Sequence, residues 1–435
     1  MSAAGVREIA EAARRASRSL ASLDESKRNR VLEALASALE HSARELFSAN
    51  EEDMRAATSR RDEDALPAST LARLKLTEPK LREMVEQVRS VAALLDPLNR
   101  KLDAIELDEG LQLEKIAVPL GVLAVIFEAR PDAVTQIASL AVKSGNAVIL
   151  KPGREVEHTA KAIVRVLRGA LAGEGIPEDA ISLVLGRDEV NELLAMHDLV
   201  DMVIPRGSKS LVEYVQANTR IPVLGHSEGI CHIYVDRAAD QELALRVVDD
   251  AKLDYPAACN AVETVLVHRD IAREFLPKLL TRLRERGVIV HGDDQVRSAN
   301  SEVQPVAAWH CEYGEPELAV GVVDSINAAI EHIHKHGSSH TESILTEDLS
   351  AAEKFLREVD AAGVFHNAST RFADGFRYGF GAEVGISTSK LHARGPVGLE
   401  GLTTYKYVLR GHGHVAGDYR GANARAFTHR REAKP

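Results

Sequence analysis

The stretch Asp254–His268, with the sequence DYPAACNAVETVLVH, joins a proline turn to a run of residues that predicts a partly buried strand. At its centre Cys259 follows two alanines and precedes Asn260, so its neighbours are too small to cover the thiol. A cysteine between a turn and a strand is placed to face a cleft, where its thiolate acts as a nucleophile if the fold lowers its pKa. The alternative is an inert core thiol, because free cysteine is among the most buried residue types.

The chain on either side of this stretch alternates short apolar runs with helical segments. Strands are predicted before it at Val122–Phe127, Ala147–Leu150, Ile181–Leu185 and Met202–Ile204. A second series is predicted at Cys231–Val235, Val262–Val267, Val288–His291, Leu318–Val323, Ser343–Thr346 and Val364–Asn367. Because helices of about 10–15 residues separate these strands, the pattern predicts βαβ units and parallel sheets covered on both faces, an α/β fold.

A chain of 435 residues is long enough for two or three domains. The segment 220–230 contains a proline and two glycines and is the predicted junction of the two sheets. Asp108-Glu109-Gly110 joins two alternating runs, which predicts a hairpin. The predicted division is N-terminal helices at 1–100, a β-hairpin at 101–118, a first α/β domain at 119–228, a second at 229–385, a return to the first domain at 386–419 and a flexible basic tail at 420–435.

The composition and net charge of the chain argue against several classes of protein function. A net charge of −11 offers no basic surface for nucleic acid or an anionic membrane, and 45% hydrophobic residues indicate packed globular structure. Three cysteines without paired spacing predict no disulfide framework and suit a reducing cytoplasm. No run approaches the roughly 18 apolar residues of a membrane span. No metal site is predicted, because His332 and His336 share a helix face but have no third ligand nearby.

Two loops that follow predicted strands have residues suited to binding phosphate. Leu150–Arg154 (LKPGR) offers two cations, and Ile204–Lys209 (IPRGSK) offers a glycine that permits close approach of the backbone. Ligands of open α/β sheets lie beyond the carboxyl ends of the strands, where helix N-termini bind anions. Neither loop is a G-x-G-x-x-G fingerprint or a P-loop. The alternative is that the glycine and lysine serve only helix capping and turn formation.

The order of these motifs resembles the aldehyde dehydrogenase superfamily. It runs through Pro119-Leu120-Gly121, Gly145-Asn146, Lys151-Pro152, Gly207-Ser208 and the Cys259 stretch. Within that superfamily the chain is similar, over nearly its whole length, to the glutamate-5-semialdehyde dehydrogenases, also called γ-glutamyl phosphate reductases. The similar segments are Phe127–Pro131 (FEARP), His226–Gly229 (HSEG), Val323–Ile344 (VDSINAAIEHIHKHGSSHTESI) and Glu383–Tyr407 (EVGISTSKLHARGPVGLEGLTTYKY).

The resemblance implies two Rossmann-type domains and a small β-hairpin oligomerisation element formed by 101–118 with Thr403–Gly411. It implies that Cys259 attacks L-glutamate 5-phosphate, that phosphate leaves, and that NADPH reduces the thioester to L-glutamate 5-semialdehyde in proline biosynthesis. The first α/β domain would bind NADP(H) and the second would contain the nucleophile. The implied partners are a second copy of this chain, in a dimer or larger assembly, and glutamate 5-kinase as the source of the acyl phosphate.

The resemblance also assigns roles to individual residues. Lys151 matches the lysine on the adenosine ribose, and Asn260 lies beside a backbone oxyanion hole around Cys259. The residues implied for cofactor binding are Lys151, Arg154, Pro205, Gly207, Ser208 and Glu312. Those implied for the substrate side are Arg130, Asn367, Arg371, Lys390 and Arg394, since cations suit a carboxylate and a phosphate. For any one of these cations a surface ion pair is the alternative.

The sequence differs from the superfamily pattern at three places, and each difference has a physical interpretation. Arg154 stands where NAD-linked relatives often carry a glutamate for the ribose 2′-hydroxyl, so a 2′-phosphate and hence NADP(H) are predicted. Hydrolytic relatives carry a glutamate base where this chain reads Leu224-Gly225-His226, and a reductase of acyl phosphates needs no activated water. Asp132 falls near the oxyanion asparagine of the superfamily and is expected to cap the following helix.

Two alternatives to the reductase stay open at this point. One is an oxidising aldehyde dehydrogenase that hydrolyses its thioester, with Glu228 as a substitute base. The other is a nucleotide-binding protein that keeps the fold for regulation or scaffolding. Fold alone does not choose between these, because unrelated activities share one fold. The context of Cys259 favours the reductase.

Overall fold

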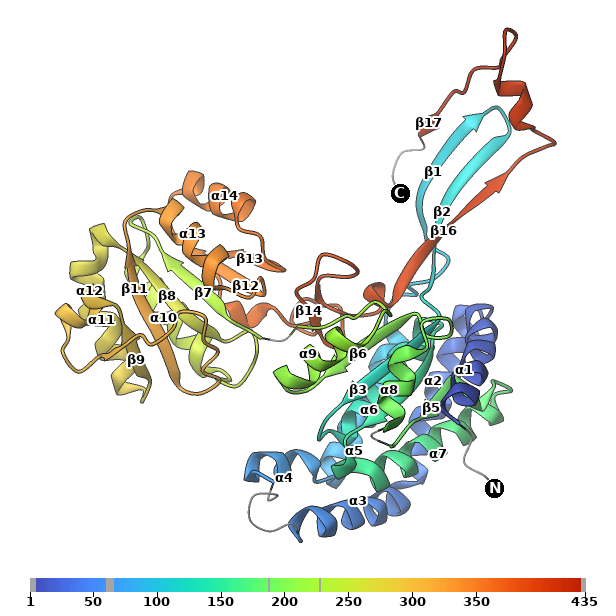
Figure 1. The fold of residues 1–435 in the computed structure, drawn as a ribbon, viewed down its shortest axis with the longest axis horizontal. Coiled ribbons are helices and arrows are strands. Elements are labelled where there is room, and N and C mark those ends of the chain that lie inside the picture. The colour runs from blue at the N-terminus through green and yellow to red at the C-terminus, as the bar shows by residue number, and fades with distance from the viewer. Residues whose placement is uncertain (1–4, 60–65, 187, 227, 432–435) are drawn as a thin grey trace.

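The computed structural model describes residues 5–59, 66–186, 188–226 and 228–431. Two α/β bodies and a projecting β-arm are joined by short connections (Figure 1). Five helices come first: α1 (Val6–Ala21), α2 (Glu25–His41), α3 (Ala43–Thr58), α4 (Ala68–Leu74) and α5 (Glu78–Ala93). Their apolar faces, such as Val31, Leu32, Leu35 and Leu39 of α2, are fully buried in the core of the first sheet. None of the helices in the described ranges is long and apolar enough to cross a membrane.

The first sheet is parallel and has the strand order β5-β4-β3-β6. Its strands are β3 (Val122–Phe127), β4 (Ala147–Pro152), β5 (Ile181–Leu183) and β6 (Met202–Arg206). Helices α6 (Pro131–Lys143), α7 (Glu157–Gly173), α8 (Asp188–Ala195) and α9 (Lys209–Asn218) connect them and lead out of β6. Every residue of β3 and β4 is buried, as expected for strands covered on both faces.

The second sheet is also parallel and has the order β10-β9-β11-β8-β7-β12-β13. Its strands are β7 (Cys231–Val235), β8 (Val262–His268), β9 (Ile289–Gly292), β10 (Gln304–Pro305), β11 (Glu317–Val323), β12 (Thr341–Leu345) and β13 (Gly363–His366). Its helices are α10 (Gln241–Leu253), α11 (Arg269–Glu285), α12 (Asp294–Ala299), α13 (Ile326–His336) and α14 (Leu349–Glu358). The α/β fold predicted from the sequence is confirmed, whereas α12 and β10 were not predicted.

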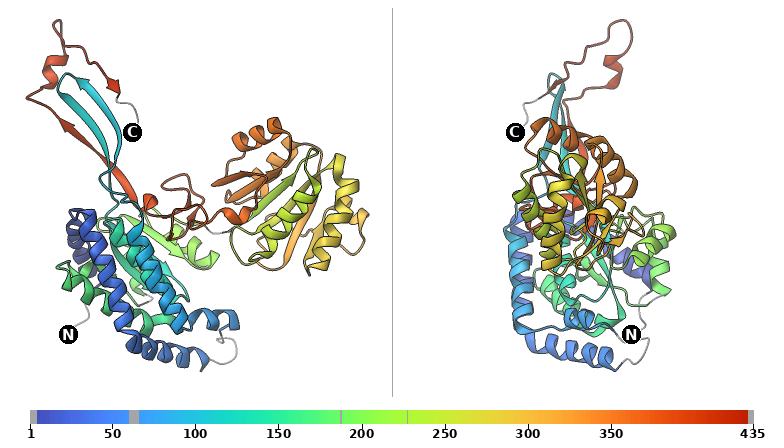
Figure 2. Two further views of the ribbon diagram at one scale, coloured as in Figure 1. Left: turned by 180° about the vertical axis from the view of Figure 1, so that it is seen from behind. Right: turned by 90° about the vertical axis from the view of Figure 1, so that its left-hand side faces the viewer.

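The projecting arm is an antiparallel sheet with the order β16-β2-β1-β17. Strands β1 (Lys101–Asp108) and β2 (Leu111–Pro119) form the predicted hairpin, and β16 (Thr403–Arg410) pairs with β2 along its whole length. Seen from behind, the arm points away from both parallel sheets (Figure 2). The short strands β14 (Ile386–Ser387) and β15 (Gly395–Pro396) lie between the two bodies.

The C-terminal segment departs from the predicted flexible tail. Up to Arg431 it lies along the arm, where β17 (Arg430–Arg431) pairs with Ile105 and Glu106 of β1; residues 432–435 lie outside the described part. Tyr419 donates a hydrogen bond of 2.9 Å to Asp108, and Arg425 forms an ion pair of 2.6 Å with the same carboxylate. The prediction of a frayed tail is wrong for these residues, because the basic segment meets an acidic hairpin.

Candidate active site

Cys259 lies in the turn between α10 and β8, at the amino end of the second sheet. The turn is closed by a 2.8 Å hydrogen bond from the Ala261 N–H to the Ala258 carbonyl. Gly229 packs so tightly that a Cβ at that position would lie 2.0 Å from the Cys259 carbonyl oxygen. Burial, and then the nearby carboxylates of Glu312 and Glu383, raise the pKa of the Cys259 thiol to about 12. The sulfur is therefore a thiol at neutral pH and needs a base to become a nucleophile.

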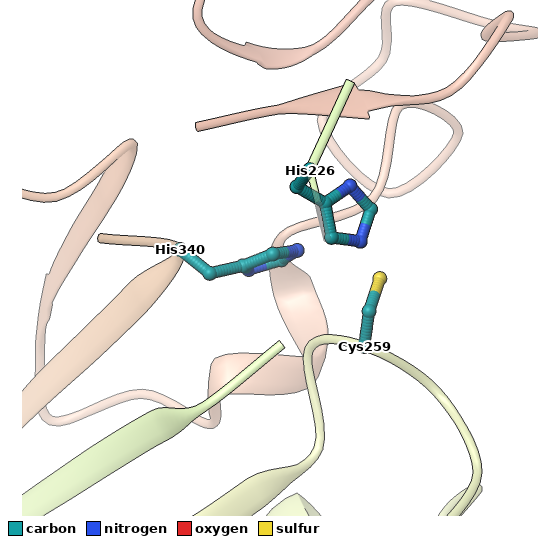
Figure 3. Close-up of side chains that lie close together, drawn as sticks. All are labelled: His226, Cys259 and His340. Atoms are coloured by element: carbon teal, nitrogen blue, oxygen red, sulfur yellow. The ribbon is translucent and has the colours of Figure 1, made fainter. Parts of the chain in front are cut away.

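Two imidazoles face this thiol from different elements (Figure 3). His226 precedes β7 in the connection between the two bodies, and His340 precedes β12. One side-chain donor atom from each of His226, Cys259 and His340 lies within 4.8 Å of the other two. The two rings meet edge to face, with centroids 5.2 Å apart. Neither histidine was predicted from the sequence, and the absence of a metal centre stays a prediction.

The other side of the nucleophile turn is held by a polar network. Arg371 donates from Nε to Asp254 at 3.0 Å and from Nη1 to the side-chain oxygen of Asn260. The Asn260 amide nitrogen donates to the Ala373 carbonyl at 2.9 Å. Arg371, predicted to bind substrate, is thus engaged in bracing the turn. The amide of Asn260 serves the same loop, and its part in an oxyanion hole stays a prediction.

A buried ion pair lies behind the turn. The Lys252 ammonium and the Glu263 carboxylate are 2.8 Å apart, and both side chains are fully buried. Burial raises the pKa of Glu263 to about 7 even though Lys252 opposes the shift. The other oxygen of Glu263 accepts a 3.3 Å hydrogen bond from the Gly314 N–H. This contact holds the loop that carries the exposed Glu312, whose carboxylate lies near enough to the thiol to raise its pKa; the cofactor-binding role of Glu312 stays a prediction.

An arginine at the end of the first sheet lies near the same thiol. Arg206, the last residue of β6, is half-buried and lies close enough to Cys259 for their charges to interact. Burial, and then the neighbouring cation of Arg130, lower the pKa of Arg206 to about 10. Its Nη1 donates to the side-chain oxygen of Gln136 at 3.0 Å. Arg206 was quoted within its loop but was not predicted as a site residue.

Glu383 completes this side of the cleft and was also missed as a site residue. It follows the loop that leaves the second sheet, and its carboxylate accepts a 2.8 Å hydrogen bond from the Gly375 N–H. Burial raises its pKa to about 7, and Arg206 opposes the shift. The only sequence signal was its place at the start of a family-like segment. Because Glu383 lies far from Cys259 in the sequence, no local pattern indicated that its carboxylate acts on the thiol.

The two predicted phosphate loops lie at the carboxyl ends of β4 and β6, which flank β3 in the first sheet. Lys151 is buried in β4, donates to the Pro152 carbonyl at 2.7 Å, and has a pKa that burial lowers. Arg154 is exposed, and its guanidinium has no hydrogen bond or ion pair within the described residues. At the other loop Pro205 is buried in β6 and Ser208 is the N-cap residue of α9.

The start of α9 is occupied by a carboxylate of the same chain. Glu128 accepts a 2.9 Å hydrogen bond from the Ser208 N–H, and a Cβ at Gly207 would lie 2.4 Å from this carboxylate. A carboxylate of the chain therefore already lies at the helix start where Gly207 and Ser208 were predicted to bind the cofactor, as the exposed N–H groups of a helix start favour.

Several predicted residues are held by internal partners. Lys390 and Arg394 both pair with Asp360, at 2.5 and 2.7 Å. Asn367 accepts from the Thr346 N–H at 2.9 Å and donates back to the Thr346 carbonyl. No hydrogen bond or ion pair joins these three residues to the nucleophile turn within the described ranges.

Two acidic residues, Asp132 and Glu228, have interaction partners that the sequence did not predict. Asp132 does not cap α6, because Arg130 is the N-cap residue; Asp132 lies in the first turn and pairs with Lys80 at 3.5 Å. Glu228, the substitute base of the hydrolytic alternative, is paired with Lys209 at 2.6 Å and with His310 at 2.9 Å. Burial alone would raise the pKa of Glu228, but these two hydrogen bonds lower it. A carboxylate so engaged is a weak base.

Comparisons with known proteins show which chains this one resembles. The profile described as "Aldehyde dehydrogenase family" matches residues 1–307. A gamma-glutamyl phosphate reductase of Cyanothece sp. is 53% identical over 97% of this chain and 97% of its own, and one of Natronomonas pharaonis is 49% identical over 96% of each. The crystal structure of gamma-glutamyl phosphate reductase from Thermotoga maritima is 39% identical, covers 95% of this chain and all of its own, and has a TM-score of 0.92.

Proposed function

Since the chain belongs to the aldehyde dehydrogenase family and, within it, to the gamma-glutamyl phosphate reductases, we propose that it reduces L-glutamate 5-phosphate to L-glutamate 5-semialdehyde with release of phosphate. The observation that carries this proposal is the site itself: the Cys259 thiol lies near the Arg206 guanidinium, while Glu228, the substitute base of the hydrolytic alternative, is paired with Lys209 and His310. A cation near a thiol suits an acyl phosphate substrate, because the phosphate is negatively charged and the carbonyl oxygen becomes negative as the thiolate attacks.

The proposed reaction has two stages. The Cys259 sulfur attacks the acyl carbon, the bond from carbon to the phosphate oxygen breaks, and inorganic phosphate leaves a thioester behind. NADPH, when bound, supplies the hydride that reduces this thioester. The carbon–sulfur bond of the resulting hemithioacetal then breaks to give the aldehyde and the free cysteine. No water is consumed, so a paired Glu228 is compatible with the whole sequence.

We infer that Arg206 and Arg130 contact the phosphate of the substrate. Both lie on the cofactor side of the cleft, and Arg130 has no ion pair or hydrogen bond of its side chain within the described residues. Arg371, Lys390, Arg394 and Asn367 reach the substrate only by exchanging their present partners. Their proposed substrate contacts follow from the family resemblance alone.

Members of this family use a nicotinamide cofactor, and we propose NADP(H) for this chain. Arg154 is an unpaired cation at the end of β4, beside Lys151. A guanidinium there suits the 2′-phosphate that distinguishes NADP from NAD. Pro205, Gly207, Ser208 and Glu312 are the further residues proposed around the cofactor. Glu128 would have to leave the start of α9 if the pyrophosphate binds there.

We propose a homodimer or larger assembly formed through the arm. The outer edge of β16 has no neighbouring strand within the described residues, and its exposed Tyr407 and Leu409 offer apolar contact area. An open strand edge with apolar side chains is completed readily by a second chain. We also propose that a glutamate 5-kinase supplies the labile acyl phosphate, and that both act in the cytoplasm.

The experiment that tests the reaction is its reverse. NADP⁺ reduction with glutamate 5-semialdehyde is measured with and without inorganic phosphate, for the wild type and for Cys259→Ala. Strict dependence on phosphate, lost in the variant, is expected. Turnover without phosphate would instead assign the chain to the hydrolytic aldehyde dehydrogenases. Turnover that survives in Cys259→Ala would remove Cys259 as the nucleophile.

A further inference from the structure

The ring of His226 is held in one orientation and one tautomer. Its Nδ1 lies 2.9 Å from the carbonyl oxygen of Ile386, at the start of β14. A carbonyl oxygen only accepts hydrogen bonds, so Nδ1 carries the proton of the neutral ring and Nε2 keeps its lone pair. Figure 3 shows that the nitrogen turned toward the sulfur of Cys259 is the one on the far side of the ring from β14.

His340 faces the same thiol but is a poorer proton acceptor. Its Nδ1 lies 2.9 Å from the Thr341 hydroxyl and 3.7 Å from the Cys231 sulfur, and its Nε2 has no hydrogen-bond partner within the described residues. Burial, and then His226, lower the pKa of His340 to about 3, so its ring stays neutral at neutral pH. His226 is only half-buried and turns a ring nitrogen that keeps its lone pair toward the same thiol.

The charged groups around His226 come from several elements. Glu228 from the same connection is turned to Lys209 and His310, and the carboxylates of Glu312 and Glu383 act on Cys259 from two other loops. Those carboxylates disfavour a free thiolate but favour a cation beside it. An imidazolium next to the sulfur would offset their charge, as a nearby cation does for other low-pKa thiols.

We propose that His226 is the general base and general acid of this active site. It takes the proton of the Cys259 thiol through Nε2, and the thiolate then attacks the acyl phosphate. After hydride transfer the imidazolium returns this proton to the alkoxide oxygen of the hemithioacetal. In the last step the same nitrogen removes that hydroxyl proton while the carbon–sulfur bond breaks and the thiolate leaves. Protonation of that thiolate by the imidazolium restores the starting state.

The separation of up to 4.8 Å between the donor atoms is longer than a hydrogen bond. Catalytic hydrogen bonds are often long in structures without ligands and shorten in the complex with substrate. The proposal rests on the thioester chemistry above, but the acid–base pair can be tested without any substrate.

The test is the rate at which iodoacetamide alkylates Cys259 between pH 6 and pH 9. The proteins are the wild type, His226→Asn, His226→Ala, His340→Gln and the surface control His41→Ala, with Cys259→Ala to identify the label. We expect the rate at pH 7 to fall at least about tenfold in His226→Asn, as removal of a general base does. Added imidazole is expected to restore reactivity to His226→Ala in proportion to its neutral form. His41→Ala should match the wild type.

A purely structural role for His226 would not give rescue by free imidazole. NADPH binding and thermal unfolding establish that each variant is folded. An unchanged rate and pH profile in His226→Asn would overturn the proposal, and so would loss of reactivity in His340→Gln alone. If alkylation depends on His226 but the phosphate-dependent reaction is absent, the acid–base pair stands and the proposed substrate fails.

Discussion

The two sides of the candidate site, here called the nucleophile wall and the cofactor wall, use their polar side chains in opposite ways. On the nucleophile wall the polar side chains form ion pairs and hydrogen bonds with one another. They are Lys252, Asp254, Asn260, Glu263 and Arg371. The cofactor wall rests on the buried strands β3, β4 and β6 and carries cations at or just beyond their carboxyl ends, namely Arg130, Arg154 and Arg206. Of these three cations, only Arg206 has a protein hydrogen bond within the described residues, to a neutral amide.

The difference reflects what each wall must do. A nucleophile has to be positioned before the substrate arrives, so the groups that hold it are satisfied inside the protein. A cation that binds phosphate must stay available, because an internal carboxylate would compete with the ligand. Lys390 and Arg394 were predicted from the sequence to bind the substrate. Both are instead paired with Asp360, as the side chains of the nucleophile wall are paired with one another.

The largest expected effect is on the buried pair of the nucleophile wall. Lys252→Met leaves the Glu263 carboxylate buried without its cation, which should lower the free energy of unfolding by about 3–5 kcal/mol. The pKa of Glu263 is already raised to about 7, and its stabilising contribution is lost as pH rises from about 4.5 through that value. Without Lys252 the pKa rises further, so urea unfolding should show a larger deficit at pH 8 than at pH 5.

The double variant Lys252→Met/Glu263→Gln is the matched control for this prediction. Since no charge is left buried, most of the lost stability should return. A deficit that is equal at both pH values, or that the double variant does not relieve, would mean that packing and not charge holds this wall.

A smaller but still severe effect is expected where the connection between the walls touches the nucleophile. Gly229→Ala places a Cβ against the backbone of Cys259, which cannot move aside as a flexible side chain would. A displacement of about 1 Å at the reacting atom costs roughly 100-fold in rate, so kcat should fall by at least that factor.

The control for this substitution is Gly169→Ala, at an exposed position of α7 with open space around it. It should leave kcat unchanged and raise thermal stability slightly, because alanine favours a helix over glycine by about 0.8–1 kcal/mol. Normal turnover in Gly229→Ala would show that the nucleophile turn tolerates rearrangement and is not preorganised.

On the cofactor wall the expected effect is on substrate affinity. Arg206→Gln removes a charge that we assign to the substrate phosphate, and a charge-assisted hydrogen bond is worth about 1.5–3 kcal/mol. The KM for glutamate 5-phosphate should therefore rise about 10- to 100-fold, while thermal stability changes little. Arg168→Gln, which removes a surface arginine paired with Asp179, serves as the control. A fall in thermal stability with an unchanged KM would mean that Arg206 supports the structure, like the side chains of the nucleophile wall, and does not bind the substrate phosphate.

The smallest expected effect concerns the choice of cofactor. Arg154→Ser should lower kcat/KM with NADPH by about tenfold, as loss of one exposed charge-assisted contact would, and leave kcat/KM with NADH unchanged. The ratio of the two values isolates the 2′-phosphate from any general damage. An equal loss with both cofactors would show that Arg154 supports the loop and does not read the phosphate.

Much of this architecture follows from local sequence signals. The apolar runs at Val122–Phe127 and Cys231–Val235 coincide with β3 and β7, because fully buried strands leave an unbroken hydrophobic record. Helix α12 and strand β10 were missed because short elements carry too few residues for a periodic pattern. The ordered C-terminal segment was missed because its stabilising partners lie on β1, more than 300 residues earlier.

The candidate site divides in the same way. Cys259, Lys151, Gly207 and Ser208 were predicted because each carries its signal in the few residues around it: a small-residue turn, a strand end or a helix start. His226, Arg206 and Glu383 were not, because their importance comes from side chains of distant segments. For Arg371, Lys390 and Arg394 the sequence showed a cation but not the carboxylate beside it.

The sequence by itself therefore determined the two parallel sheets and the family, and it singled out Cys259 as the candidate nucleophile. Hydrophobic periodicity and turn residues are local properties that survive in a linear string. Only the tertiary structure decided which charged side chains form ion pairs and which have no such partner within the described residues. The reason is that pairing depends on distances between segments far apart in the chain. The same holds for the nucleophile: its residue type identified the thiol, and the fold placed His226 beside it.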